Sequence, residues 1–209
     1  MSNITFDAQA KTKKEKEDIE WLRIWCEEVN DETLPHVALI GDSITEGYYQ
    51  LVKNAFKGIA KVDYLATSYS LDSEIYLSVV KKFVEDSDYA VVHYNYGLHA
   101  HGVDAETYER RCKEVLSHIL ERTKAVVATS TVVFDESLEQ ENPHWKKSVA
   151  IRNEKLCAVA KELGLKIDDL NAWSKELKGD SRCPDGVHFS EKGYAVLAQS
   201  VVNSVKEFL

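Results

Sequence analysis

The chain has 209 residues, of which 44% are hydrophobic and 29% are charged, a composition typical of one α/β domain with a full hydrophobic core. Its formal net charge of -9 argues against a nucleic-acid partner, because neutralising phosphates requires clustered lysine and arginine. No apolar run approaches the ~20 residues that span a bilayer, so no membrane partner is expected.

The first residues, 1–6, lack the charged and then apolar order of a signal peptide, which makes the cytoplasm the default expected location. The four cysteines are widely spaced and form no C-x-x-C pair. We therefore expect free thiols in a reducing compartment. Cys183 lies two residues before Asp185 and could be reactive, but packing is the favoured role. The cysteines are Cys26, Cys112, Cys157 and Cys183.

The first element in chain order is a helix expected over residues 13–29, where apolar side chains share one face at helical spacing. It would belong to an N-terminal helical extension, residues 1–30, packed on a single domain that comprises residues 1–209. Five short apolar stretches follow, each bounded by polar or helical sequence, and each is predicted to form a strand. They are residues 37–40, 62–66, 89–94, 125–128 and 165–167.

Helical periodicity fills the gaps at residues 72–84, 104–121 and 145–163, and a last helix is expected to begin at Ser190, an N-cap residue type. Strands that alternate with helices imply parallel pairing through right-handed crossovers. We therefore expect an α/β fold, a flavodoxin-like three-layer α/β/α sandwich with a five-stranded parallel sheet. The polar stretch 135–144 is long for such a fold and is expected to form a flap beside the site.

The most informative sequence is Gly41, Asp42 and Ser43, which follows the first predicted strand. A hydroxyl at the carboxyl end of a parallel strand lies at the edge where open α/β sheets place their chemistry. Far downstream, Asp185 and His188 stand three positions apart in a loop expected at the same edge, just before the last helix. A serine, a histidine and a carboxylate are the parts of an acyl-transfer triad.

The G-D-S sequence at residues 41–43, together with D-G-V-H at residues 185–188, resembles the SGNH or GDSL hydrolase (esterase/lipase) superfamily. The resemblance extends from the first strand to the last helix. It is distinct from the G-x-S-x-G nucleophile elbow, because Thr45 stands where that motif needs its second glycine. It implies an SGNH-type α/β/α fold and a serine that forms an acyl-enzyme, and we expect no cofactor.

Each implied role has a physical reason. A free serine hydroxyl is a weak nucleophile, so His188 would take the proton of Ser43 and later return it to the leaving alcohol. Asp185 would hold the imidazole tautomer and stabilise the imidazolium. A purely structural interpretation also exists, since His188 could cap the following helix and residues 184–186 form a good turn sequence. Asp42 is expected to accept backbone N–H groups and is kept as a candidate for substrate binding.

An esterase also needs an oxyanion hole, because charge develops on the carbonyl oxygen. In the resembled family the donors are the N–H of the nucleophile, here Ser43, a glycine N–H after the second strand and an asparagine side chain after the third. This chain has Tyr69 in place of that glycine, and its N–H could still donate. Asn95 is favoured as the amide donor, with Asn95→Ala expected to lower turnover at little cost in stability. His99 is the rival if Gly97 aligns with the motif glycine, and a further substrate-binding candidate.

Histidines 93, 99 and 101 suggest a metal site, but no cysteine or acidic ligand set stands beside them, so we expect no metal. Several aromatic residues are predicted near the same edge, where they would suit sugar rings or aryl groups, although core packing explains them equally well. They are Tyr48, Tyr49, Tyr94, Tyr96 and Trp145.

The leading interpretation is a serine esterase that hydrolyses small acyl esters, with a carbohydrate acetyl esterase as the favoured case. The alternative is an inactive or weakly active ligand-binding protein on the same scaffold, because the oxyanion positions are altered. A phosphate binder is poorly supported, since a Gly-rich phosphate loop would not place an acid directly after Gly41. The expected partner is a small-molecule ester, and the sequence leaves a homo-oligomer open.

Overall fold

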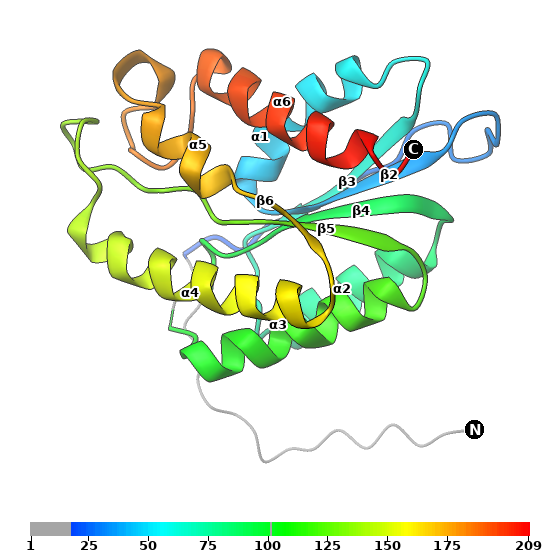
Figure 1. The fold of residues 1–209 in the computed structure, drawn as a ribbon, viewed down its shortest axis with the longest axis horizontal. Coiled ribbons are helices and arrows are strands. Elements are labelled where there is room, and N and C mark those ends of the chain that lie inside the picture. Colours follow the sequence, from blue (N-terminus) through cyan, green and yellow to red (C-terminus); the bar gives the residue numbers. More distant parts are fainter. Residues whose placement is uncertain (1–17, 101) are drawn as a thin grey trace.

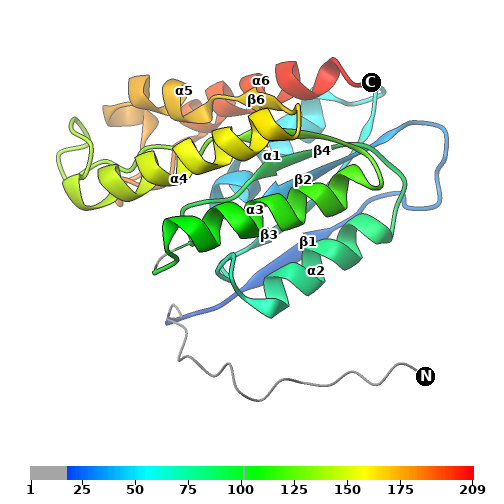
Figure 2. The same cartoon turned by 60° about the horizontal axis from the view of Figure 1, so that its bottom comes forward.

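The computed structural model describes residues 18–100 and 102–209. A six-stranded sheet lies between two layers of helices, with α1, α5 and α6 over one face and α2, α3 and α4 over the other (Figure 1). The strand order is β1-β3-β2-β4-β5-β6. β2 to β6 are parallel, and β1 pairs antiparallel with β3 at the edge of the sheet (Figure 2). The predicted α/β/α class is confirmed, with one strand more than expected.

Each of the five predicted strands is present. The central strands form because their apolar runs are buried on both faces, as in a parallel sheet covered by two helical layers. The strands are β2 (His36–Gly41), β3 (Lys61–Thr67), β4 (Tyr89–Asn95), β5 (Lys124–Ala128) and β6 (Lys166–Asp168).

The helices begin at polar residues whose side chains accept a backbone N–H from the first turn, which is the usual N-cap arrangement. Ser190 caps the last helix, as the sequence predicts. Two helices, α1 and α5, were not expected. The helices are α1 (Ser43–Ala55), α2 (Glu74–Glu85), α3 (Ala105–Leu120), α4 (Pro143–Glu162), α5 (Leu170–Glu176) and α6 (Glu191–Lys206).

The helix expected over residues 13–29 is wrong for the part that the structure describes, and residues 1–17 lie outside the described residues. β1 (Leu22–Trp25) occupies this segment, paired with β3 from Leu22 opposite Thr67 to Trp25 opposite Tyr64. Its side chains are exposed, so the apolar face that suggested a helix is not buried. Pairing with the backbone of β3 therefore overrides the local periodicity.

The hydrophobic core has two parts, one on each face of the sheet, and the first packs under α2 to α4 while the second packs under α1 and α6. Within residues 18–100 and 102–209, no helix has the length and apolar composition needed to cross a bilayer. Because β2, β3 and β4 are parallel neighbours, their carboxyl ends open onto one edge of the sheet. The loops that leave this edge carry the residues predicted to act on a substrate.

Candidate active site

The G-D-S sequence forms the junction between β2 and α1. A side chain at Gly41 would have its Cβ 2.4 Å from the carbonyl oxygen of Asn95 in the adjacent strand, so only glycine fits. Asp42 is buried and caps α1, since its Oδ1 accepts the N–H of Ile44 at 3.0 Å. Ser43 is the first residue of the helix and is half-buried. The sequence thus presents a serine hydroxyl at the carboxyl edge of the sheet.

His188 and Asp185 reach this hydroxyl from the loop before α6. His188 Nε2 lies 2.8 Å from Ser43 Oγ, and Nδ1 lies 2.7 Å from Asp185 Oδ2. The second oxygen of Asp185 accepts the N–H groups of Val187 and His188, both at 2.9 Å. The three residues that the sequence singled out therefore form one continuous series of hydrogen bonds, with the acid fixed by its own turn.

The Asp185 carboxyl is ionised more readily than usual. Partial burial acts to raise its pKa, but the hydrogen bonds from the His188 ring and from the N–H groups of His188 and Val187 outweigh it and hold the pKa below the ordinary value. A negative charge therefore faces the imidazole ring on the side opposite Ser43.

The loop that carries Asp185 and His188 turns at Gly186, where φ is +69°. A Cβ at this position would also lie 2.3 Å from the carbonyl oxygen of Phe134, so the turn and the close approach both require glycine. The N–H of Phe134 donates to the carbonyl of Gly186 at 2.9 Å. Phe134 bridges to Glu141 at the base of the polar stretch expected to form a flap. That stretch therefore contacts the site loop at its base.

Arg182 holds the same loop in place, a role that the sequence does not predict. Its buried guanidinium lies between two aromatic rings, 4.3 Å from the centroid of Phe134 and 4.1 Å from that of Phe189. Burial lowers its pKa to about 10. It donates four hydrogen bonds to backbone carbonyls, those of Val132, Ser174, Leu177 and Gly186. The local sequence does not indicate this set of partners, since Val132 and Ser174 lie outside the connection between α5 and α6.

The expected oxyanion donors differ in how they face the site. Ser43 contributes an N–H from the first turn of α1, where backbone donors lack intrahelical partners. The N–H of Tyr69 already donates to Thr67 Oγ1 at 3.1 Å. Asn95 is only 2% exposed, and its Nδ2 lies 3.5 Å from the Tyr48 hydroxyl beneath α1. The amide of Asn95 is thus directed into the interior.

His99 lies in the turn after β4 and is half-buried. Burial raises the pKa of the Asp42 carboxyl, whereas the charges of His99 and His188 and the N–H groups of Ile44 and Leu98 act in the opposite direction. Leu98 thus ties the turn to Asp42, and both imidazoles act on the same carboxylate beside Ser43. His99 therefore lies close enough to influence the Asp42 carboxyl, whereas Asn95 is buried.

The other histidines do not join this arrangement. His93 is fully buried, and its Nε2 lies 3.1 Å from Asp168 Oδ2, while His101 falls outside the described residues. Among the described residues, no three His, Cys, Asp or Glu side chains are grouped to hold a metal ion. The aromatic residues expected at the edge are instead mostly core, because their side chains are buried or packed against it. These are Tyr48, Tyr49, Tyr94, Tyr96 and Trp145.

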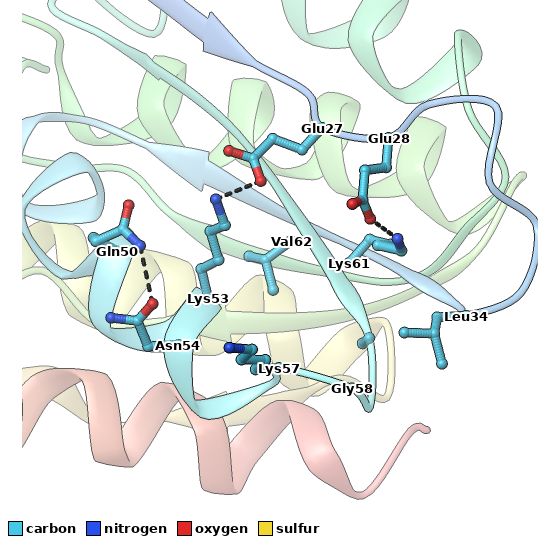
Figure 3. A pocket seen from close by; sticks show the side chains of 11 residues that line it. Glu27, Glu28, Leu34, Gln50, Lys53, Asn54, Lys57, Gly58, Lys61 and Val62 are labelled. Carbon is cyan, nitrogen blue, oxygen red and sulfur yellow. Dashed lines mark hydrogen bonds and ion pairs between the residues drawn. The ribbon is translucent and has the colours of Figure 1, made fainter.

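A cavity of about 340 Å³ lies at the other end of α1, near the start of β3 (Figure 3). Two of the lysines that line it are paired within the cavity wall, Lys53 with Glu27 and Lys61 with Glu28. None of the candidate site residues lines this cavity. The candidate site is therefore the half-open surface around Ser43 rather than this cavity.

The fold and this geometry can be compared with known proteins. The sequence matches no protein-family model and no curated protein. Solved structures are similar. A lipase/acylhydrolase from Enterococcus faecalis aligns with a TM-score of 0.67 at 20% identity, covering 83% of this chain and 96% of the other. A protein of the lipolytic G-D-S-L family from Veillonella parvula aligns with a TM-score of 0.67 at 14% identity, covering 83% and 99%.

This chain has the fold of the SGNH/GDSL hydrolases. A third similar structure is a variant of an acetyl xylan esterase from Geobacillus stearothermophilus, with a TM-score of 0.65 at 15% identity, covering 82% of this chain and 94% of the other. The resemblance inferred from the two short motifs is therefore confirmed for the fold. Because fold does not fix activity, function must be argued from the residues around Ser43.

Proposed function

We propose that this protein is a serine esterase that cleaves small acyl esters through an acyl-enzyme on Ser43. The observation that carries the proposal is the continuous hydrogen-bonded series from Asp185 through His188 to Ser43 at the carboxyl edge of a parallel sheet. A base within hydrogen-bond reach of a hydroxyl, and an acid that orients that base, are the geometric requirements for an activated nucleophile. The SGNH/GDSL fold adds independent support.

The chemistry proceeds in two halves. Ser43 Oγ attacks the ester carbonyl while its proton passes to His188 Nε2, and the tetrahedral intermediate collapses as the same proton goes to the departing alcohol. Water then attacks the acyl-enzyme while His188 takes a proton from it, and His188 passes that proton to Ser43 Oγ as the bond to the acyl group breaks and the carboxylic acid leaves. Asp185 stays ionised throughout and stabilises the imidazolium, which its lowered pKa favours.

The developing oxyanion would be stabilised by the N–H of Ser43, near the positive end of the α1 dipole, and by a donor from the turn after β4. We assign that second donor to His99, because Asn95 is buried beneath α1. The N–H of Tyr69 can contribute only by sharing its hydrogen bond with Thr67. A histidine in this position gives a donor where the resembled family has an amide.

The substrate class that we favour is an acetylated carbohydrate. The side chains of His188 and Asp185 are 38% and 50% exposed, so the reacting groups lie on an open surface that accepts a bulky polar alcohol. One similar solved structure is an acetyl xylan esterase, which agrees with this preference.

The test is covalent labelling by a fluorophosphonate probe together with hydrolysis of short p-nitrophenyl esters. Wild type should be labelled and should turn over the acetyl ester, and Ser43→Ala should lose both while keeping its melting temperature. Ser78→Ala, at an exposed serine on α2, is the matched control and should behave as wild type. Ligand binding without labelling or turnover in wild type would favour the non-catalytic alternative.

A further inference from the structure

Trp21 is held at the carboxyl edge of the sheet by its own backbone. Its N–H donates to Ser68 Oγ at 2.8 Å, and its carbonyl accepts the N–H of Ser68 at 3.1 Å and the hydroxyl of Thr67 at 2.6 Å. Ser68 directly follows the end of β3 and precedes Tyr69. Because β3 pairs with β2 up to Gly41, the segment before β1 reaches the level of the strand end from which Ser43 emerges.

The side chain of Trp21 extends from this position to the turn after β4. Its ring meets the ring of His99 edge to face, with centroids 6.3 Å apart and planes at 89°. The charge of His99 in turn acts to lower the pKa of Asp42, the residue next to Ser43. The half-buried indole therefore lies beside the site, bounded by the loop after β3 and the turn after β4.

Polar groups surround this indole. The Arg23 guanidinium lies 5.4 Å from the ring centroid and pairs with Glu46 in the first turn of α1. Glu20 accepts a hydrogen bond from Ser68 Oγ at 2.8 Å. An aromatic face within reach of guanidinium and carboxylate groups combines an apolar stacking surface with hydrogen-bonding partners.

We propose that Trp21 forms the binding surface for a sugar ring on the alcohol side of the ester. This inference rests on the proposed esterase function and adds a residue and a ligand chemistry to it. The C–H face of a pyranose packs on an aromatic ring, while its hydroxyls need the polar partners that Arg23, Glu20 and Glu46 supply. A plain aryl alcohol would use the ring but would offer no hydroxyls to these polar groups.

The test compares three acetyl esters, an acetylated methyl pyranoside, phenyl acetate and ethyl acetate, on wild type and Trp21→Ala. Trp25→Ala is the matched control, because Trp25 ends β1, ~13 Å further along the extended chain from Trp21, and is 55% exposed. Trp21→Ala should lower the ratio of kcat/KM for the pyranoside to that for ethyl acetate about tenfold, and Trp25→Ala should leave the ratio at the wild-type value.

Calorimetric binding of the acetylated pyranoside to Ser43→Ala, with and without Trp21→Ala, makes the inference independent of turnover. A Kd about tenfold higher in the double variant supports the sugar surface even if wild type hydrolyses no ester, in which case only the esterase function fails. An unchanged Kd and an unchanged kcat/KM ratio overturn the inference while active wild type leaves the esterase intact. A loss confined to phenyl acetate, or equal on all three esters, also overturns it.

Discussion

Ser43 and His188 lie 145 positions apart in the sequence, yet His188 Nε2 lies 2.8 Å from Ser43 Oγ because α1 and α6 pack closely just beyond these residues. The contact is made at Gly47 on α1 and Tyr194 on α6. A Cβ at Gly47 would lie 2.0 Å from Cζ of Tyr194, so the absence of a side chain sets how near the two helices come. The distance between nucleophile and base therefore depends on a glycine one turn away.

Gly47→Ala should accordingly separate the two helices at the site. We expect a loss of about 1–3 kcal/mol in the free energy of unfolding from overpacking, together with slower labelling of Ser43 by a fluorophosphonate. Urea melts and labelling rates check this. Combining Gly47→Ala with Tyr194→Ala should give less than the sum of the single losses, since both changes act on one contact. Strictly additive losses of stability in the double variant would contradict this. Gln50→Ala, at an exposed residue on the same helix, should change neither stability nor the labelling rate.

Arg182→Met should remove the donors that hold the loop of Asp185 and His188. Leaving buried carbonyls without partners should cost about 2–4 kcal/mol of stability. At temperatures where the variant stays folded, labelling of Ser43 should still be slower, because His188 is no longer held in place. Arg110→Met, at an exposed arginine on α3, controls for loss of charge. Wild-type labelling in a folded Arg182→Met protein would show that the guanidinium has no positioning role.

Substitutions of Asn95 and His99 should have different effects on kcat and on stability. His99→Ala should lower kcat about 100-fold with little change in melting temperature, as expected for loss of an oxyanion donor on the surface of the site. His99→Asn should retain more activity, because it restores an amide donor. Asn95→Ala should mainly lower stability, by about 1–3 kcal/mol, since the side chain is buried. The reverse pattern, with kcat lost only in Asn95→Ala, would return the role to the residue that the sequence favoured.

The value of kcat/KM should fall on the acid side, because a protonated imidazole at His188 cannot accept the proton of Ser43. The pKa of Asp185 is lowered in the folded protein, so this carboxylate keeps its charge through that range. Its contribution to stability is complete above the ordinary carboxyl pKa and is lost as the pH falls through the lowered one.

Asp185→Asn should therefore reduce kcat about 10³–10⁴-fold, and the stability difference from wild type should shrink below a pH of about 4. Because the Asp185 side chain is half exposed, solvent screening keeps this difference small. Urea melts between pH 3 and 7 measure it. A difference that grows with acid would mean that the sign of the pKa shift is wrong.

The sequence by itself determined the parallel strands and the residues at their ends. Apolar runs such as residues 37–40 are buried on both faces only when the strand lies between two helical layers. Ser190 caps its helix through local hydrogen bonds. Short-range chemistry of this kind is encoded within a few residues. It also places Ser43 and His188 at the same edge, because Ser43 follows a parallel strand and His188 precedes a helix, and the helices of such a sheet begin at the carboxyl edge of its strands.

Only the tertiary structure decided the fate of residues 18–29, the acceptors of Arg182 and the burial of Asn95. The segment Leu22–Trp25 has helical periodicity, yet it forms a strand because β3 offers it an unpaired backbone edge. Arg182 finds its acceptors on segments up to 50 positions away. Asn95 is buried and His99 half-buried because of the path of the chain at the end of β4, which packing fixes and local sequence does not.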